Sequence, residues 1–316
     1  MSFYDSIKVI EPKKSFSAYD FLKELVEIHN IYPDAIQQST YFPPRLMYLV
    51  DIANKLDIKY KLDVFEYAGN DLNLINRPFS PKLANLILFP NPQAKGPATV
   101  FVAHHDVANI HSQNTNDNSA SVCHLLHLAR LINDDPENSR RTIIIFTSAE
   151  ECGGHGARRF AQNIYTSNPS NPIINHNLYG PIDAVINLEL TGVGTEIWSD
   201  SKIRNPKELA LYNKLETAFN QKIHLKTTPF SDAVIFRNYN YPIACLGLLA
   251  SDDLKDNKIW FLCHKLEDTI NRCASTNDMQ SFTNKLHDFT KIYGPKDQPT
   301  SIQSATSVSN KRAETT

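Results

Sequence analysis

Acidic residues and histidines recur along the chain in short groups, most of them at the end of an apolar run. Imidazole and carboxylate side chains are ligands of divalent cations, and carboxylates also serve as general bases. If the apolar runs are parallel strands, their ends meet at one edge of a sheet. The sequence therefore predicts a site for a pair of divalent cations, built from His104-His105-Asp106, Asn116-Asp117-Asn118, Glu150-Glu151, Glu189, and His264 with Glu267-Asp268-Thr269.

Glu150 and Glu151 form the most informative of these groups. They follow residues 141–148, an apolar and β-branched run typical of a central strand, so charged side chains there require partners or a cavity. Adjacent side chains point in different directions, so we expect Glu151 to bind a cation. Glu150 would then act as general base on the metal-bound water. The alternative is a helix start with acids near the positive end of its dipole.

His104 and Asp106 suit a metal-binding imidazole whose orientation is fixed by a carboxylate. Residues two apart share a face, so Asp106 is expected to accept the proton on the far ring nitrogen of His104. Asp117 is expected to bridge two cations, one oxygen to each, which holds them roughly 3.5–4 Å apart. Both segments also fit a simpler reading, because aspartate, asparagine and serine are common helix caps.

Glu189 and His264 supply the remaining candidate ligands. Glu189 ends the apolar run 185–188, where an unpaired carboxylate would be costly, so a cation or an arginine is expected beside it. His264 follows the strand-like run 259–263 and could complete the shell of the second cation. A single histidine is more often structural than metal-binding, so this assignment depends on the neighbouring groups.

Apolar periodicity predicts the elements that position these groups. Continuous apolar strands alternating with amphipathic helices indicate an α/β fold, in which a mixed, mostly parallel sheet is covered by helices on both faces. Such sheets bind ligands at the carboxyl ends of their strands. Strands are expected at 59–67, 86–89, 98–103, 141–148, 184–188 and 243–249, and helices at 19–28, 43–56, 119–132, 156–165, 206–219 and 279–293.

The 316 residues are expected to form a single domain. Residues 1–97 would contribute a helical segment and the first strands, and 98–295 the catalytic core. Residues 296–316, rich in serine, threonine, asparagine and glutamine, are expected to be a disordered tail.

Composition excludes several classes of function. A formal net charge of -2 gives no electrostatic reason to expect nucleic acid or an anionic membrane as partner. No stretch approaches the roughly 20 apolar residues needed to span a bilayer, and the first ten residues lack the pattern of a secretory signal. Five cysteines without a framework spacing suit a reducing compartment, so we expect a cytoplasmic protein.

The ordered groups together resemble the co-catalytic zinc exopeptidases of metallopeptidase family 28, which includes bacterial aminopeptidases and relatives of glutamate carboxypeptidase II. The resemblance extends from about residue 98 to the last helix. It rests on Phe101-Val102-Ala103-His104-His105-Asp106, Asn116 to Val122, Ser148 to Gly156, Asn187-Leu188-Glu189-Leu190, Ser231 to Phe236 and His264 to Thr269, which follow the family order.

This resemblance implies a single-domain zinc-exopeptidase fold that binds two divalent ions, with zinc expected. One ion would be held by His104 and Glu189 and the other by Glu151 and His264, while Asp117 bridges them. The family's general base falls on Glu150 and its orienting acid on Asp106, and Ser231-Asp232 would lie near the substrate. The short segment between Glu189 and Ser231 leaves no room for the lid domain of the related two-domain peptidases.

Two departures from the family pattern concern the ligands and the pocket wall. The position of Glu189 is usually aspartate, so the side chain here is one methylene longer. Lys265-Leu266 replaces the common Thr-Pro of the last block. For the end of the substrate, Glu196, Asp200 and Asp232 are candidates to bind an amine, and Arg237 and Lys265 to bind a carboxylate.

The function that follows is a metal-dependent exopeptidase, with an aminopeptidase that hydrolyses peptide or aminoacyl substrates as the leading hypothesis. A carboxypeptidase or dipeptidase is the nearest alternative. A glutaminyl cyclase-like enzyme would use one zinc and would be expected to have lost some ligand positions, whereas all five hold competent groups here. A non-catalytic binding scaffold would also be expected to have lost ligands or the base.

Overall fold

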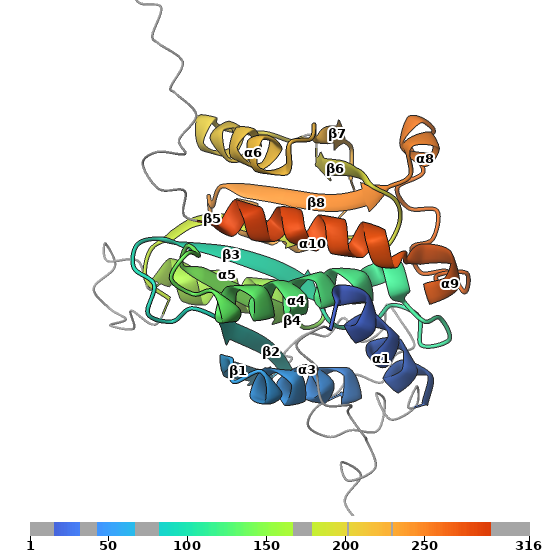
Figure 1. Cartoon of the computed structure of the whole chain (residues 1–316), viewed down its shortest axis with the longest axis horizontal. Helices are drawn as coiled ribbons and strands as arrows, with labels where there is room; N and C mark the ends of the chain where they lie inside the picture. Colours follow the sequence, from blue (N-terminus) through green and yellow to red (C-terminus); the bar gives the residue numbers. More distant parts are fainter. Residues whose placement is uncertain are drawn as a thin grey trace, which may run out of the picture.

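The computed structural model describes residues 16–31, 43–66, 82–166, 179–200, 202–228 and 230–291. Within these residues, eight strands form a central mixed sheet (Figure 1). The eight strands lie in the order β1-β2-β4-β3-β5-β8-β6-β7. Their bounds are β1 (Lys59–Glu66), β2 (Lys82–Phe89), β3 (Ala98–His104), β4 (Thr142–Thr147), β5 (Ile182–Leu188), β6 (Glu196–Asp200), β7 (His224–Lys226) and β8 (Ile243–Leu249).

The centre of the sheet is parallel. Strand β3 pairs with β4 on one side and β5 on the other, and β5 pairs with β8, all in parallel. Every residue of β3, β4 and β8 is buried, as expected for strands covered on both faces. Antiparallel pairs join β1 to β2, β2 to β4 and β6 to β8, and β7 runs parallel to β6 at the far edge.

Helices cover both faces of this sheet, and each face has its own apolar cluster. In β3, Phe101 and Ala103 belong to one cluster while Val100 and Val102 belong to the other, as the alternation of a strand requires. The first face is covered by α1 (Ala18–Ile31), α3 (Pro44–Lys55), α4 (Ala120–Asp134), α6 (Pro206–Phe219) and α10 (Thr276–Thr290), and the second by α5 (His155–Thr166) and α7 (Asp232–Asn238). Local signals mark some boundaries: Asn205 caps α6 by accepting from the amides of Lys207 and Glu208.

The predicted α/β fold class is confirmed, and each predicted helix and strand matches an observed element to within a few residues. The interpretation of the apolar run 259–263 as strand-like is wrong, because these residues form turns between α8 (Ser251–Lys255) and α9 (Ile270–Cys273). Its apolar side chains pack in a third cluster, with Leu190, Trp198 and Leu249, instead of pairing with the sheet. Strands β6 and β7 and helices α7, α8 and α9 are too short for periodicity to have shown them.

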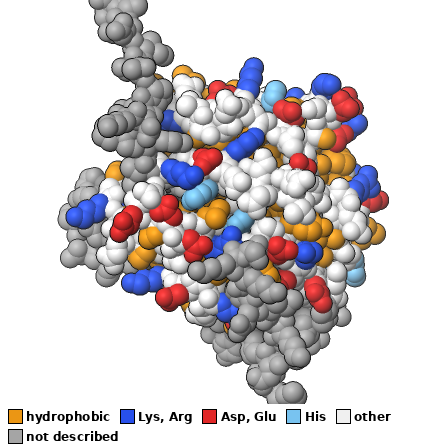
Figure 2. Space-filling model, viewed as in Figure 1, with side chains coloured by type: hydrophobic (Ala, Val, Ile, Leu, Met, Phe, Trp, Pro, Cys, Tyr) orange, Lys and Arg blue, Asp and Glu red, His pale blue; other side chains and the backbone are white. Residues whose placement is uncertain are grey.

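Charges of both signs are mixed over the described surface that Figure 2 shows, consistent with the near-neutral formal charge. Among the described helices, none is both long enough and apolar enough to cross a membrane. The expected tail at 296–316 lies outside the described residues.

A buried histidine at the junction of α4 and α10 predicts how stability depends on pH. His124 faces the hydroxyl of Thr283 at 2.8 Å and the carbonyl of Thr191 at 3.3 Å, and its ring meets Phe282 edge-on. Burial lowers the pKa of His124 from 6.5 to about 4. Below about pH 6.5 the unfolded chain therefore takes up a proton that the folded chain refuses, and the free energy of unfolding falls.

The expected loss from this residue is about 2 kcal/mol at about pH 5 relative to neutral pH. Thermal unfolding followed by circular dichroism across this pH range measures it. A His124→Gln variant, which cannot be protonated, should lose less stability on acidification than the parent. The same substitution at exposed His111 is the control, and an unchanged slope in His124→Gln would contradict the assignment.

Candidate metal centre

Three neighbouring parallel strands deliver most of the predicted residues to one edge of the sheet. His104 is the last residue of β3, Glu150 and Glu151 follow β4 after a two-residue turn, and Glu189 follows β5 directly. Because β4, β3 and β5 are adjacent and parallel, their carboxyl ends lie side by side.

Asp117 approaches the same edge from the turn Thr115–Ser119, which precedes α4. Its φ and ψ of -115° and 88° are not helical, and the bond to Asn118 is a cis peptide. The carboxylate of Asp268 accepts the amides of Asn116 at 2.7 Å and of Asp117 at 3.0 Å, so a side chain from the far end of the chain fixes this turn. Capping was the alternative reading of this segment, but α4 begins after Ser119, which makes no side-chain cap, and the Asp117 carboxylate faces two histidines.

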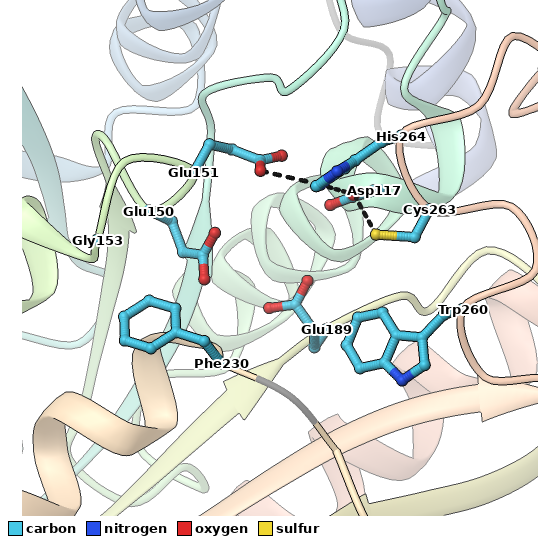
Figure 3. Close-up of a pocket in the computed structure, with 9 residues that line it drawn as sticks. All are labelled: Asp117, Glu150, Glu151, Gly153, Glu189, Phe230, Trp260, Cys263 and His264. Atoms are coloured by element: carbon cyan, nitrogen blue, oxygen red, sulfur yellow. Dashed lines mark hydrogen bonds and ion pairs between the residues drawn. The ribbon is translucent and has the colours of Figure 1, made fainter. Parts of the chain in front are cut away.

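The two oxygens of Asp117 serve two different sets of side chains. Oδ1 lies 3.4 Å from Nε2 of His104, which in turn lies 3.4 Å from Oε1 of Glu189. Oδ2 lies 3.3 Å from Nε2 of His264, which lies 3.0 Å from Oε2 of Glu151 (Figure 3). The five predicted ligands therefore form two chains of contacts that share one carboxylate. The possible ligand atoms that all lie within 4.8 Å of one another belong to His104, Asp117 and Glu151, and to Asp117, Cys263 and His264.

The three separations of 3.3–3.4 Å match what a shared cation requires, whereas that between His264 and Glu151, at 3.0 Å, is shorter. Two ligands at zinc distances of about 2.0–2.2 Å, set at a tetrahedral angle, are about 3.3–3.6 Å apart. Oε1 of Glu151 and Oε2 of Glu189 are buried without a hydrogen-bond partner among the described residues. Burial raises the pKa of both carboxyls, and the Asp117 carboxylate beside them adds to the effect. Buried acids with unused oxygens, arranged around imidazole nitrogens, fit divalent cations.

Asp106 connects the segment of His104 to the turn that carries Glu150 and Glu151, through hydrogen bonds to the backbone of that turn. Its carboxylate accepts the amides of Glu150 and Glu151, each at 3.2 Å, and so fixes the turn after β4. Nδ1 of His104 lies 3.2 Å from the backbone oxygen of Asp106 and 3.6 Å from Oδ1 of its carboxylate. Asp106 thus lies beside the far ring nitrogen as predicted, but the shorter contact is made by its main chain. Although burial opposes ionisation, His104 and the amide of Glu150 hold the pKa of Asp106 below its usual value.

Glu150 occupies a different position from the groups around Asp117. Its carboxylate lines the cavity and points toward that of Glu189 (Figure 3). Burial raises its pKa well above the usual value, and the acids Glu189, Asp232 and Glu151 raise it further while His104 opposes them. A carboxyl group with a raised pKa is a stronger base when ionised, which suits a group that takes a proton from water.

The space in front of these residues is a cavity of about 350 Å³. No lysine or arginine is among its lining residues, which are Asp117, Glu150, Glu151, Gly153, Glu189, Phe230, Trp260, Cys263 and His264. Sequence reasoning did not single out Phe230, Trp260 or Cys263 as wall residues. Only Cys263 carried a signal, because it adjoins His264.

None of the five side chains suggested as substrate anchors lines this cavity. Arg237 and Asp200 form a buried ion pair with each other. Glu196 accepts a hydrogen bond from Ser251 and lies near His224, and Lys265 is exposed. Asp232 is buried behind the cavity and accepts a hydrogen bond from Thr147. Burial raises the pKa of Asp232 to about 7. Asp232 is nevertheless close enough to His104 for that side chain to oppose the increase.

Arg45, which the sequence did not highlight, is a buried cation behind the site. Its Nε donates to the carbonyl of His105 at 3.0 Å, and one of its terminal nitrogens donates to the hydroxyl of Ser119 at 2.9 Å. These two acceptors flank the loop that joins His104 to Asp117. Helix α3 therefore ties down both ends of the segment that supplies two predicted ligands.

Comparisons with known proteins place this arrangement in a family. A search of curated proteins found no match. Among solved structures, a glutaminyl cyclase of Porphyromonas gingivalis is similar with a TM-score of 0.64 at 16% identity, over 87% of this chain and 96% of that one. The LapA aminopeptidase of Legionella pneumophila is similar with a TM-score of 0.62 at 14% identity, over 86% and 70%. A zinc aminopeptidase of Bacillus subtilis gives 0.53 at 18% identity, over 66% and 50%.

At such identities these structures show a shared fold and nothing finer. The family model is more specific: that of peptidase family M28 matches residues 85–290, which contain all seven predicted site residues. The chain therefore belongs to peptidase family M28 and has the metallopeptidase fold of that family.

Proposed function

We propose that the protein is a zinc-dependent aminopeptidase that binds two metal ions. The observation that carries the proposal is the shared carboxylate of Asp117, whose two oxygens face His104 and His264 at 3.4 and 3.3 Å. Glu189 completes the first set and Glu151 the second. A divalent cation in each set would satisfy the buried carboxylate oxygens that lack partners among the described residues.

Each residue then has a distinct task. Metal ions bound there would polarise a peptide carbonyl and lower the pKa of a bound water. Glu150, at the cavity wall, would take a proton from water and pass it to the leaving amine. Asp106 orients His104 and holds the backbone of Glu150 and Glu151 in place.

The charge of the cavity wall supports an aminopeptidase over a carboxypeptidase. The wall carries four carboxylates, from Asp117, Glu150, Glu151 and Glu189, and its lining residues include no lysine or arginine. A free α-carboxylate needs a cationic partner to be desolvated, and the charges of the two proposed ions would be offset by these four carboxylates, so the wall offers no unpaired cation for it. Of the two cationic candidates from the sequence, Arg237 is paired with Asp200 and Lys265 is exposed, and neither is among the lining residues.

A glutaminyl cyclase is the second candidate, because enzymes of that name are among the structures with the same fold. This candidate requires one zinc and no attack by water on a peptide bond. Competent ligands are present here at both proposed metal positions, whereas a one-metal enzyme needs only one such set. Complete sets favour hydrolysis, and they also weigh against a non-catalytic scaffold.

The general base is tested by Glu150→Gln, which keeps shape and removes the proton acceptor. We expect kcat on aminoacyl chromogenic substrates to fall by about 10²–10⁴-fold, while zinc content and fold stay as in the parent. Glu137→Gln, at an exposed position away from the site, is the matched control. Full activity in Glu150→Gln would remove Glu150 from the mechanism.

The number of metal ions separates the two candidate enzymes. Elemental analysis of the full-length protein should give two zinc ions per chain, and chelation should abolish hydrolysis until zinc is restored. One zinc per chain, together with cyclisation of peptides that begin with glutamine and no hydrolysis, would replace the aminopeptidase by the cyclase.

Metal removal should also destabilise the fold, because the cations offset repulsion among buried carboxylates. Zinc at 100 times its dissociation constant should raise the free energy of unfolding by about 2.7 kcal/mol per site. Differential scanning calorimetry with and without chelator measures this change. Asp117→Asn, which weakens both sets, should show a smaller zinc-dependent rise, and an equal rise would argue against a shared carboxylate.

A further inference from the structure

A cysteine lies among the side chains that surround Asp117. Sγ of Cys263 is 3.1 Å from Oδ2 of Asp117, the same oxygen that faces Nε2 of His264 at 3.3 Å (Figure 3). The ligating atoms of these three residues all lie within 4.8 Å of one another. Cys263 also lines the cavity, so its sulfur is directed to the space where the second cation would be held.

A second observation points to a ligand at this position. The carboxylate of Glu151 is buried, with its side chain only 6% exposed, and Oε1 has no hydrogen-bond partner among the described residues. Its other oxygen, Oε2, is 3.0 Å from His264. Glu151 therefore contacts His264 and Cys263 contacts Asp117, so the two side chains approach the Asp117–His264 pair from different sides.

The sulfur is close to the position that coordination requires. With Zn–S at about 2.3 Å and Zn–O at about 2.1 Å, sulfur and oxygen on a tetrahedral zinc are about 3.6 Å apart. The present separation of 3.1 Å, made by a thiol that donates to Asp117, differs from this by a small side-chain movement. Serine or alanine at this position would provide no comparable ligand for zinc.

We propose that Cys263 is a fourth protein ligand of the metal ion held by Asp117, Glu151 and His264. The inference rests on the proposed function, because this is the second of the two proposed ions. On binding, the S–H bond of Cys263 is broken, its proton passes to solvent, and the sulfur forms a bond to the metal without any change of oxidation state.

This ligand makes the two ions unequal. Four protein ligands close a tetrahedral zinc site, whereas a site with three keeps a position for water. The ion held by His104, Asp117 and Glu189 retains that position, and the Glu150 carboxylate points toward Glu189 (Figure 3). The reacting water therefore belongs to the His104 side. The thiolate also favours zinc over magnesium or manganese at the His264 side, because it is a soft ligand.

Zinc X-ray absorption spectroscopy on the full-length protein loaded with two equivalents of zinc tests the proposal. We expect a sulfur scatterer at about 2.3 Å, beside nitrogen and oxygen at about 2.0 Å. The scatterer should disappear in Cys263→Ser and persist in Cys152→Ser. Cys152 is the matched control because it is the other half-buried cysteine, whereas Cys123, Cys245 and Cys273 are buried.

Cobalt provides a second readout with the metal alone. Cobalt(II) bound to the parent and to Cys152→Ser should show sulfur-to-metal charge-transfer absorption, which Cys263→Ser should lack. In competition with a chelator, Cys263→Ser should bind one of its two zinc ions roughly 10- to 100-fold more weakly, similar to the loss when a supporting group of a metal site is removed.

A readout on the unmodified chain covers the case in which Cys263→Ser does not fold. Zinc should protect Cys263, but not Cys152, from alkylation by iodoacetamide, with the labelled peptides identified by mass spectrometry. Two bound zinc ions with only nitrogen and oxygen neighbours, and alkylation of Cys263 unaffected by zinc, would overturn the role of Cys263 alone. Failure to bind zinc at all would overturn the proposed function as well.

Discussion

Buried negative charge at the carboxyl edge of the sheet is the constraint on which the rest of this molecule depends. Carboxylates in a low-dielectric region repel one another strongly, and each also loses hydration. Their pKa values show the strain: burial raises those of Glu150, Glu151, Glu189 and Asp232. The fold keeps these acids together by surrounding them with backbone amides, imidazoles and one buried arginine.

The N-terminal helices belong to this compensation as much as to the core. Arg45 on α3 is 2% exposed, and its positive charge lies behind the acids without a direct ion pair to any of them within the described part of the chain. It is bound to a carbonyl and a hydroxyl that flank the loop from His104 to Asp117. A cation held in this way makes the local electrostatic potential less negative and leaves the carboxylate oxygens free for other ligands. Asp268 is an acid and not a cation, and its carboxylate accepts the backbone amides of the turn that contains Asp117.

The sequence was sufficient to predict which acidic and histidine side chains the fold brings together, but not to describe their surroundings. The strand ends were predictable because buried parallel strands are continuous apolar runs; Glu189 and His104 follow such runs directly, and Glu150 follows one after a short turn. Asp117 was ambiguous, since Asn116 to Ser119 has the composition of a helix cap, and only the tertiary contact with Asp268 turns it toward the histidines. Arg45 and Trp260 gave no local signal, because their positions depend on packing between segments far apart in the chain. The run before His264 was misjudged for the same reason: its apolar residues cover the end of the sheet.

The two histidines give the site an asymmetry that the sequence alone does not reveal. His104 ends a central strand and its side chain is 1% exposed, whereas that of His264 is 54% exposed and its backbone has a φ of 60° in a turn. A ligand on a rigid strand is ordered before metal binds, while a ligand on an exposed turn loses conformational freedom when it is fixed. With equal ligand sets the His264 side would therefore bind more weakly. Glu151, oriented through the contact of its amide with Asp106, and the sulfur of Cys263 are the groups that offset this cost. In the proposed two-ion site, the His264 side would thus have to hold its ion on an exposed turn, whereas the His104 side would keep a position for water.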